Sequence, residues 1–394
     1  MISSGLSLFL ASLATQAPAQ APPAETGSQN ITVVGRRIQD QREVLARCLA
    51  RNCPPNEDID ATLGLAEMQF EAGDYRGARQ TMRESVGRNR RHAAAYPVPV
   101  SDLYRSLSRV ASHMGEEREA RLSALRIGET LEAGFGAGDP RLLGARMEYA
   151  NTLLTTGDRV RAIPVLEDLE RDARRAGRAD VADMAQLRLL WIRYLGGQKG
   201  PVKAQLERLA RASAPADRFL SVGATVLLAG IHRREGDART ADALIAQLGR
   251  MHGGQRAMIF QPPYQLRFQG PAVEAGGFVG ADDLRNSTVS ERTWIDVGFW
   301  INPDGTVRDL EVVREGEPHV WAEPLLEAIR GRRYSASADG SATYRLERYT
   351  YTANLEARTG SLSRQRSTQG RVEYLDLTRE GAEPGEPPAP GRQP

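Results

Sequence analysis

The sequence contains few side chains whose types and spacing could support catalysis or metal binding. Its histidines stand far apart, and none falls in a His-Glu-x-x-His or related metal-ligand spacing: His92, His113, His232, His252 and His319. The sequence contains no nucleophile elbow, no P-loop and no dinucleotide fingerprint after a strand. Acidic pairs such as Glu116-Glu117 are typical of solvated turns rather than of acid–base catalysis. We therefore expect no enzymatic activity, no cofactor and no metal ion; an exported enzyme with an unrecognised site is the alternative.

Two cysteines, Cys48 and Cys53 in "CLARNCPP", are the remaining reactive side chains. In a continuous helix their Cα atoms would lie ~7.5 Å apart along the axis, which is too far for a disulfide. Pro54 disfavours helical geometry at Cys53, so a turn there can bring the two sulfur atoms together. We predict a structural disulfide, which would stabilise the fold by about 2 kcal/mol in the chain-entropy model. Free thiols or a redox dithiol are the alternative, although C-x4-C is not the redox spacing.

The first residues predict export. An apolar run, Gly5 to Ala14, precedes Ala17-Pro18-Ala19, which places small residues at a cleavage position. Together they indicate a secretory signal peptide that ends at residue 19. The run is shorter than the ~20 residues that a permanent membrane anchor needs. We therefore predict a periplasmic protein of a Gram-negative bacterium with no stable membrane anchor; an apolar N-terminus without this role is the alternative.

Charge and length limit the partners and the number of domains. The 52 basic and 50 acidic residues leave a net charge of +2, which gives no strong global field for nucleic acid or a membrane surface. At 394 residues the chain is long enough for two or three domains. We expect its partners to be proteins or extended peptide segments, and no nucleic acid.

Residues 58–253 predict a series of helical hairpins. In "FEAGDYRGARQ" and in three later segments, a glycine is followed five positions later by an alanine. The glycine can end one helix in a left-handed conformation, and the alanine permits a close crossing of the next helix. A further turn at "LGGQKGP", residues 195–201, completes five hairpins. The glycine–alanine pairs are Gly73 and Ala78, Gly115 and Ala120, Gly157 and Ala162, and Gly236 and Ala241.

These hairpins resemble the tetratricopeptide repeat (TPR) family. The first hairpin carries the best match, with small, turn and aromatic residues at the family's positions: Ala66, Gly73, Tyr75, Ala78 and Ser85. The resemblance implies an all-α solenoid whose concave face binds peptides or proteins. The alternative is a helical bundle in which such turns arise without a ligand groove.

The sequence after residue 253 predicts a linker, 254–290, and then a small α+β domain. Apolar residues alternate along a strand from Ile295 to Ile301, and Asp304-Gly305 predicts a hairpin turn to a second strand. An amphipathic helix follows near residues 322–329, and "SATYRLERYTYTANLEA" is a long aromatic and β-branched strand. The expected order is therefore strand, strand, helix, strand.

That order resembles the TonB C-terminal domain family over residues 291–357. The resemblance rests on the "F-x-I-x-x-D-G-x-V-x-x-L-x-V-V" run from Phe299 to Val313, on the amphipathic helix and on Arg332-Arg333-Tyr334 at its end. The family captures a short strand, the TonB box, from outer-membrane receptors. The resemblance implies a strand-capturing domain; a component of TonB-type energy transduction in transmembrane transport is an alternative function.

A second strand is predicted near the mature N-terminus. Four consecutive residues in "NITVVGRR" suit a strand and resemble a TonB box: Ile31, Thr32, Val33 and Val34. We predict that residues 30–36 add to the edge of the strand at residues 343–355, whose interface residues would be Tyr344, Leu346, Tyr349 and Tyr351. The pairing could form within one chain or between the two chains of a homodimer. The alternative is that residues 31–34 only cap the first hairpin or stay disordered.

The sequence thus predicts a multi-domain, non-enzymatic scaffold. Its expected segments are a signal peptide (1–19), an N-terminal extension (20–57), TPR-like repeats (58–253), a linker (254–290), a TonB C-terminal-like domain (291–357) and a Pro/Gly-rich, mostly disordered tail (358–394).

Overall fold

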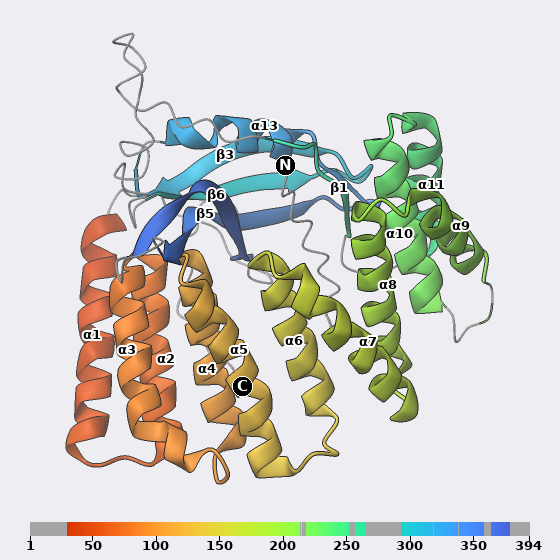
Figure 1. The fold of residues 1–394 in the computed structure, drawn as a ribbon. Coiled ribbons are helices and arrows are strands. Elements are labelled where there is room, and N and C mark those ends of the chain that lie inside the picture. The colour runs from red at the N-terminus through yellow and green to blue at the C-terminus, as the bar shows by residue number, and fades with distance from the viewer. Residues whose placement is uncertain are drawn as a thin grey trace. The chain divides into compact units, whose positions relative to one another are not determined.

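The computed structural model describes residues 30–212, 214, 218–251, 257–264, 293–317, 319–337, 339–357 and 364–378. The predicted signal peptide therefore lies outside the described residues, as do most of the linker and the end of the tail. The chain divides into two compact units at residues 152 and 153, within helix α6 (Arg141–Thr155). We call them the N-terminal and the C-terminal unit and describe each by itself (Figure 1).

The N-terminal unit is helical. Consecutive helices pack against each other from α1 to α4, and α4 packs on α5. The bounds are α1 (Asn30–Ala50), α2 (Pro55–Glu71), α3 (Tyr75–Asn89), the short 3-10 helix η1 (Arg90–His92), α4 (Pro97–His113) and α5 (Glu117–Phe135), followed by most of α6. Helix α2 also contacts α4, so the first helices of two successive hairpins lie side by side.

The predicted N-terminal strand is wrong. Residues 30–36, including Ile31, Thr32, Val33 and Val34, form the first turns of α1. Helix propensity explains why the prediction failed: a β-branched residue costs at most about 0.7 kcal/mol relative to alanine. Once the following residues form a helix, each added residue gains a hydrogen bond without a new nucleation cost. The propagating helix therefore outweighs a short run of β-branched residues.

Each hairpin turn uses the same backbone hydrogen bonds. Gly73 has a φ of 80° and donates its N–H to the carbonyl of Phe70 at 2.9 Å. Asp74 donates to the carbonyl of Gln69 at 2.8 Å, and its side chain accepts from the N–H of Gly77. This pair of bonds is the Schellman motif, which satisfies the last carbonyl groups of a helix. The same pair recurs at Gly115, Gly157, Gly197 and Gly236.

Four of these glycines, all except Gly197, are followed five residues later by a completely buried alanine. Ala78, Ala120, Ala162 and Ala241 each expose 0% of their surface. The pattern also occurs at a turn that the sequence interpretation did not identify, between α7 and α8. There Gly177 has a φ of 70° and Ala182 exposes 0% of its surface.

The C-terminal unit begins with the remaining helices. They are α7 (Arg159–Arg175), α8 (Ala179–Leu195), α9 (Lys199–Ala210), α10 (Arg218–Arg234) and α11 (Ala238–Met251). Helices α8, α9 and α10 share one apolar core. Taken along the chain, α2/α3, α4/α5, α6/α7, α8/α9 and α10/α11 are the five helix pairs that the glycine turns predict.

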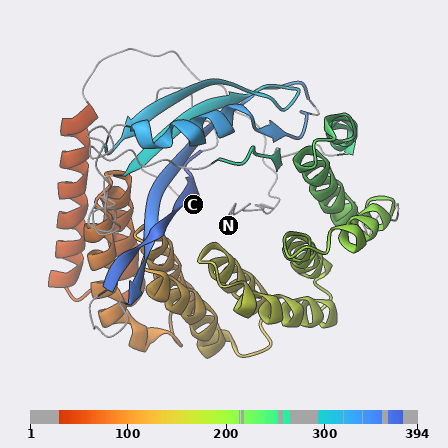
Figure 2. The ribbon, with the colours of Figure 1, turned by 45° about the horizontal axis from the view of Figure 1, so that its top comes forward.

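A small antiparallel sheet follows, in the strand order β3-β2-β5-β6 (Figures 1 and 2). Helix α13 covers one face, where its apolar residues pack on Val297, Phe299 and Tyr349. The bounds are β2 (Trp294–Ile301), β3 (Val307–Glu315), the 3-10 helix η3 (His319–Ala322), α13 (Glu323–Arg330), β5 (Thr343–Ala357) and β6 (Arg364–Asp376). The chain is thus a mostly helical repeat region with a small antiparallel sheet region at its C-terminal end.

Strand β6 corrects two expectations. It lies within the segment 358–394 that we expected to be mostly disordered, and it pairs with β5 from Glu347 to Ala357. Strand β5 therefore has β2 on one side and β6 on the other, so residues 347–350 are paired on both sides and present no free edge. Alternation explains the pairing: Val372 and Tyr374 pack on the same core as α13.

A short strand, β1 (Met258–Phe260), ties the sheet to the last helical hairpin. It lies within the predicted linker and pairs with β4 (Arg333–Tyr334), which follows α13. Ile259 is buried between α10 and α11, whereas its neighbour Met258 packs against the core of the sheet. A Cβ atom at Gly230 would lie only 2.8 Å from the carbonyl oxygen of Ile259, so the close approach requires glycine. The sheet and the α10/α11 hairpin are therefore joined through β1.

Candidate protein-interaction site

The outer edge of β6 is the candidate site. Leu377 donates its N–H to the carbonyl of Leu346 at 2.8 Å, which sets the phase of the ladder between β5 and β6. Because alternate residues of an antiparallel strand face the partner, Arg371, Glu373 and Leu375 direct their backbone groups toward β5. The residues between them, Val372, Tyr374 and Asp376, direct N–H and C=O away from β5. Within the described residues, β6 is the outermost strand on this side of the sheet.

The ladder is regular along this part of β6. Residues 370–376 pair one to one with residues 353–347, and the register shifts only beyond Ala353. This part of β6 contains no proline and no lysine, which are common protective residues on edge strands. The outer edge therefore remains suitable for a further strand.

The opposite edge of the sheet is different. The pairing of β3 with β2 shifts register twice, between Asp296 and Val297 and between Gly298 and Trp300. Asp309, in the middle of β3, has a φ of 50°, a left-handed conformation that interrupts an extended strand. Bulges are one feature by which proteins prevent pairing at a sheet edge. The two edges are thus unequal, and β6 is the receptive one.

A buried ion pair fixes β5 on the face covered by α13. Arg332 donates from Nη1 to the Glu347 carboxylate at 2.6 Å, and their side chains expose 3% and 4% of their surface. Arg332 also donates to the Tyr349 hydroxyl at 2.6 Å and to Gln261 at 2.8 Å. The hydroxyl of Tyr374, on β6, donates to the other oxygen of Glu347 at 3.1 Å. This cluster joins β6, β5 and the segment after β1.

The environment shifts the pKa values in this cluster. Burial alone would lower the pKa of Arg332, but the adjacent Glu347 carboxylate more than offsets burial and raises it well above its ordinary value. Burial raises the pKa of Tyr334 to about 12. Burial and the Glu347 charge raise the pKa of Tyr374 as well. The tyrosines therefore remain protonated hydrogen-bond donors around a permanently charged guanidinium.

A second buried ion pair lies on the opposite face of the sheet. Arg348 donates to both carboxylate oxygens of Asp296, at 2.6 and 2.9 Å, and both side chains expose 0% of their surface. Arg314 on β3 donates to the same carboxylate at 2.8 Å, and the Arg348 guanidinium lies 4.0 Å from the ring of Trp294. These contacts join β3, β2 and β5 on this face of the sheet.

The four residues predicted as an interface on β5 do not share a face. Tyr349 and Tyr351 are buried in the core under α13. Tyr344 and Leu346 lie on the other face, where Tyr344 contacts Trp300 at a ring distance of 5.5 Å. Tyr351 covers Gly370 of β6, which has no side chain of its own. The tyrosines thus pack within the sheet instead of forming a binding surface.

The TPR-like residues of the first hairpin form a packed turn. Tyr75 exposes 1% and Ala66 exposes 4% of its surface. The Tyr75 ring lies 4.7 Å from Phe70, and His113 of the next hairpin lies edge-on to Phe70 at 5.0 Å. These residues determine how two hairpins stack and are not themselves exposed to a ligand.

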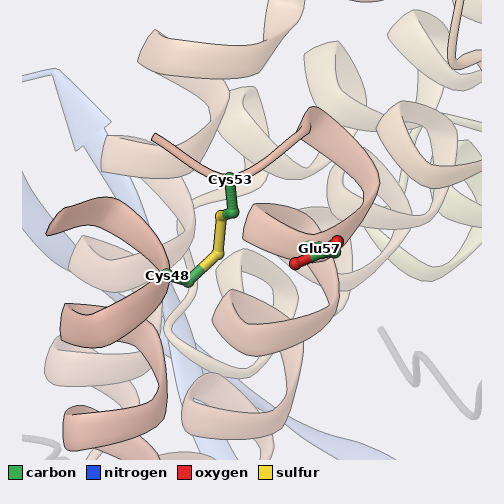
Figure 3. A group of neighbouring side chains, drawn as sticks. All are labelled: Cys48, Cys53 and Glu57. Atoms are coloured by element: carbon green, nitrogen blue, oxygen red, sulfur yellow. A yellow bond between two sulfur atoms is a disulfide. The ribbon is translucent and has the colours of Figure 1, made fainter. Parts of the chain in front are cut away.

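The structure joins Cys48 to Cys53 by a disulfide, with a Cα–Cα distance of 5.2 Å (Figure 3). Cys48 lies in the last turn of α1, and Cys53 precedes α2. Asn52, at the tip of the connection, has a φ of 52°, which reverses the chain. Glu57 in the first turn of α2 lies beside the two sulfur atoms. Within the described residues, no helix is long and apolar enough to span a membrane.

The sequence interpretation missed β6 and both buried ion pairs. The alternation of Val372 and Tyr374 with polar residues is a strand signal that the Pro-rich end of the chain masked. Arg332 and Tyr334 belong to the Arg332-Arg333-Tyr334 motif after the helix. Their partner Glu347 lies on β5, and the sequence alone does not show which charged residues of that strand contact the motif. Only the register of β2 with β5 places Asp296 opposite Arg348.

No protein-family model and no curated protein matches the sequence. Among solved structures, the chain is similar to two crystal structures described as Podosopora anserina putative kinesin light chain nearly identical TPR-like repeats, one of them a point variant. Each is 16% identical, has a TM-score of 0.38 and covers 50% of this chain; the matches span 95% and 96% of those chains. These neighbours are TPR-like repeat proteins, and this chain is likewise helical with repeats. The hairpins and the sheet edge, rather than this likeness, support the function below.

Proposed function

We propose that this chain is a non-enzymatic protein-interaction scaffold whose sheet captures an extended segment of another protein at the outer edge of β6. The observation that carries the proposal is the inequality of the two sheet edges. The β3 edge is interrupted by two register shifts, whereas residues 370–376 of β6 form a regular ladder with outward-facing backbone groups. Adding a strand to such an edge satisfies these groups without rearranging the sheet.

The surroundings of the edge define the partner. Val372 and Tyr374 lie on the α13 side of the sheet, and Leu375 lies on the other, next to Arg348. All three are only partly buried. A captured strand would cover these side chains on both faces of the sheet if consecutive residues of the strand are apolar. Segments of consecutive β-branched residues meet this condition. Short β-branched segments near the N-termini of outer-membrane receptors are one partner class of this chemistry.

The captured strand would occupy a different edge from the one that the TonB resemblance suggests. The resemblance predicts that the long strand after the helix, which is β5 in this chain, has a free edge. Because β6 occupies that position, the proposed capture takes place one strand further out. Energy transduction is not required for this function.

The helical repeats supply the second part of the scaffold. In TPR-like arrays, stacked hairpins present an extended surface for proteins or peptides. The recurring Schellman turns and buried alanines support this role by making each hairpin a similar structural unit. We further propose that the protein works in the periplasm after removal of residues 1–19, on the strength of the apolar run and the small residues that follow it.

A peptide selection tests the proposal. A library of random twelve-residue peptides displayed on phage is selected against the purified protein, and the binders are then measured against a Val372→Pro variant. Val372 directs its N–H outward, so proline at this edge position leaves the β5–β6 ladder intact but removes one bonding group. We expect β-branched peptides whose affinity falls at least about tenfold in the variant, the loss of one or two net hydrogen bonds. Peptides that bind both proteins equally would contradict capture at β6.

A further inference from the structure

The loop between α1 and α2 gathers a set of side chains that the proposed strand capture does not use. The sulfur atoms of Cys48 and Cys53 and a carboxylate oxygen of Glu57 all lie within 4.8 Å of one another (Figure 3). In the disulfide, neither sulfur is a thiolate, so the set cannot bind a metal ion in this state. After reduction, the same side chains would offer two thiolates and one carboxylate.

This donor set fits a tetrahedral zinc ion. Zn²⁺ binds cysteine sulfur at about 2.3 Å and carboxylate oxygen at about 2.0–2.2 Å, and three protein ligands with one water are a common arrangement. Two thiolates on a tetrahedral zinc ion lie about 3.8 Å apart, so the sulfur atoms must separate from their bonded distance. Cα atoms 5.2 Å apart allow that separation by side-chain rotation and a small change in the loop.

The loop is also held by groups other than the disulfide. Cys53 donates its N–H to the carbonyl of Cys48 at 3.1 Å, and Asn52 donates to Leu49 at 3.1 Å. These bonds close the turn in the backbone, so we expect the cysteines to stay adjacent after reduction. Cys53 is the more exposed cysteine, which gives a reductant access to the bond.

The charges nearby favour thiolates and leave Glu57 available. Cys53 lies just before the N-terminus of α2, where the helix dipole stabilises negative charge. Glu57 pairs with Arg51, but the two side chains are 42% and 65% exposed, so that pair contributes little and is easily exchanged. The neighbouring Asp58 is not available as a ligand, because its carboxylate accepts from Arg88 and Asn89.

We propose that reduction converts the disulfide loop into a zinc site formed by Cys48, Cys53 and Glu57. A dithiol reductant supplies two electrons and two protons to the S–S bond and becomes a disulfide itself. Zn²⁺ then displaces the two thiol protons and forms two Zn–S bonds and one Zn–O bond, with water in the fourth position. The oxidised chain has no such site, so the redox state of the loop controls metal binding.

Spectroscopy with Co²⁺ as the probe tests the proposal on the full chain. The reduced protein should bind one Co²⁺ and show a thiolate-to-cobalt charge-transfer band, which Zn²⁺ abolishes by displacement. The oxidised protein should show no band. Glu57→Gln should bind Co²⁺ at least about tenfold more weakly, as expected for the loss of a ligand. The matched control is Asp60→Asn, an exposed carboxylate on the same helix, which should bind as the unmodified chain does.

Thermal unfolding gives a second measurement that does not depend on the Co²⁺ spectrum. Zn²⁺ should raise the Tm of the reduced chain, because it binds the folded loop, and should leave the Tm of the oxidised chain unchanged. The proposal is overturned if the reduced protein shows no thiolate band and no rise in Tm. It is also overturned if Glu57→Gln binds Co²⁺ as tightly as the Asp60→Asn control.

Discussion

Arg332 and Glu347 form a buried ion pair at 2.6 Å that connects the end of α13 with β5. Removing one partner of such a pair leaves an uncompensated charge in the core, which typically destabilises a protein by about 3–5 kcal/mol. We predict a loss of this size in the free energy of unfolding for Glu347→Gln, measured by urea denaturation. The matched control is Glu327→Gln, whose pair with Arg330 is exposed; it should cost less than about 1 kcal/mol. Equal effects of the two substitutions would show that the buried cluster is not fixed as described.

The same cluster predicts a loss of stability at high pH. The folded-state pKa of Tyr334 is about 12, because burial opposes the phenolate, whereas an unfolded tyrosine ionises near its ordinary value of 10.0. The stabilisation is complete below that ordinary value, and it is lost as the pH rises toward 12, because the unfolded chain then binds fewer protons than the folded one. The Tm should therefore fall across this range. Burial and the Glu347 charge also raise the pKa of the partly buried Tyr374. Tyr374→Phe, which removes this second phenol, should therefore make the fall shallower; an unchanged slope would contradict the assignment.

Gly230 provides a test of the connection between the sheet and the helices. A methyl group there would lie 2.8 Å from the carbonyl oxygen of Ile259, which is backbone and cannot turn aside. We predict that Gly230→Ala destabilises the C-terminal unit by about 1–3 kcal/mol, as in other overpacked sites. Gly87→Ala is the control, because a methyl group at that position in α3 meets nothing within 4 Å; it should stabilise the chain by up to about 1 kcal/mol. Both variants are compared with the unmodified chain by thermal unfolding. If Gly230→Ala raised the Tm as Gly87→Ala does, β1 would not approach α10 as closely as described.

The repeat turns make a prediction about Ala78. It exposes 0% of its surface where α3 packs against its neighbours, so Ala78→Leu should overpack the site and cost about 1–3 kcal/mol. Gln80→Leu on the same helix is exposed and should change stability by less than about 0.5 kcal/mol. A Tm for Ala78→Leu equal to that of the control would mean that the helices do not cross at Ala78.

Much of the fold follows from local sequence signals. The glycine–alanine spacing predicted four of the five hairpins, because a left-handed helix end and a close crossing each tolerate few residue types, and the glycine-rich turn at residues 195–201 predicted the fifth. The Asp304-Gly305 turn and the alternation from Ile295 to Ile301 likewise predicted β2 and β3. Local signals failed where the rest of the chain determines the structure. Residues 31–34 join a helix that propagates into them from the following residues. Strand β6 forms because β5 offers an edge with which it can pair. The buried pairs of Arg332 and of Asp296 depend on strand register, which a single sequence does not specify.

The most direct test of capture at β6 is amide hydrogen exchange resolved at single residues. In the free protein, the amides of Arg371, Glu373 and Leu375 should exchange slowly, because they bond to β5, and those of Val372 and Asp376 should exchange fast. A bound peptide from the selection should slow exchange at Val372 and Asp376. Fast exchange at these two amides in the presence of saturating peptide, with new protection confined to the helical repeats, would contradict strand capture by the sheet.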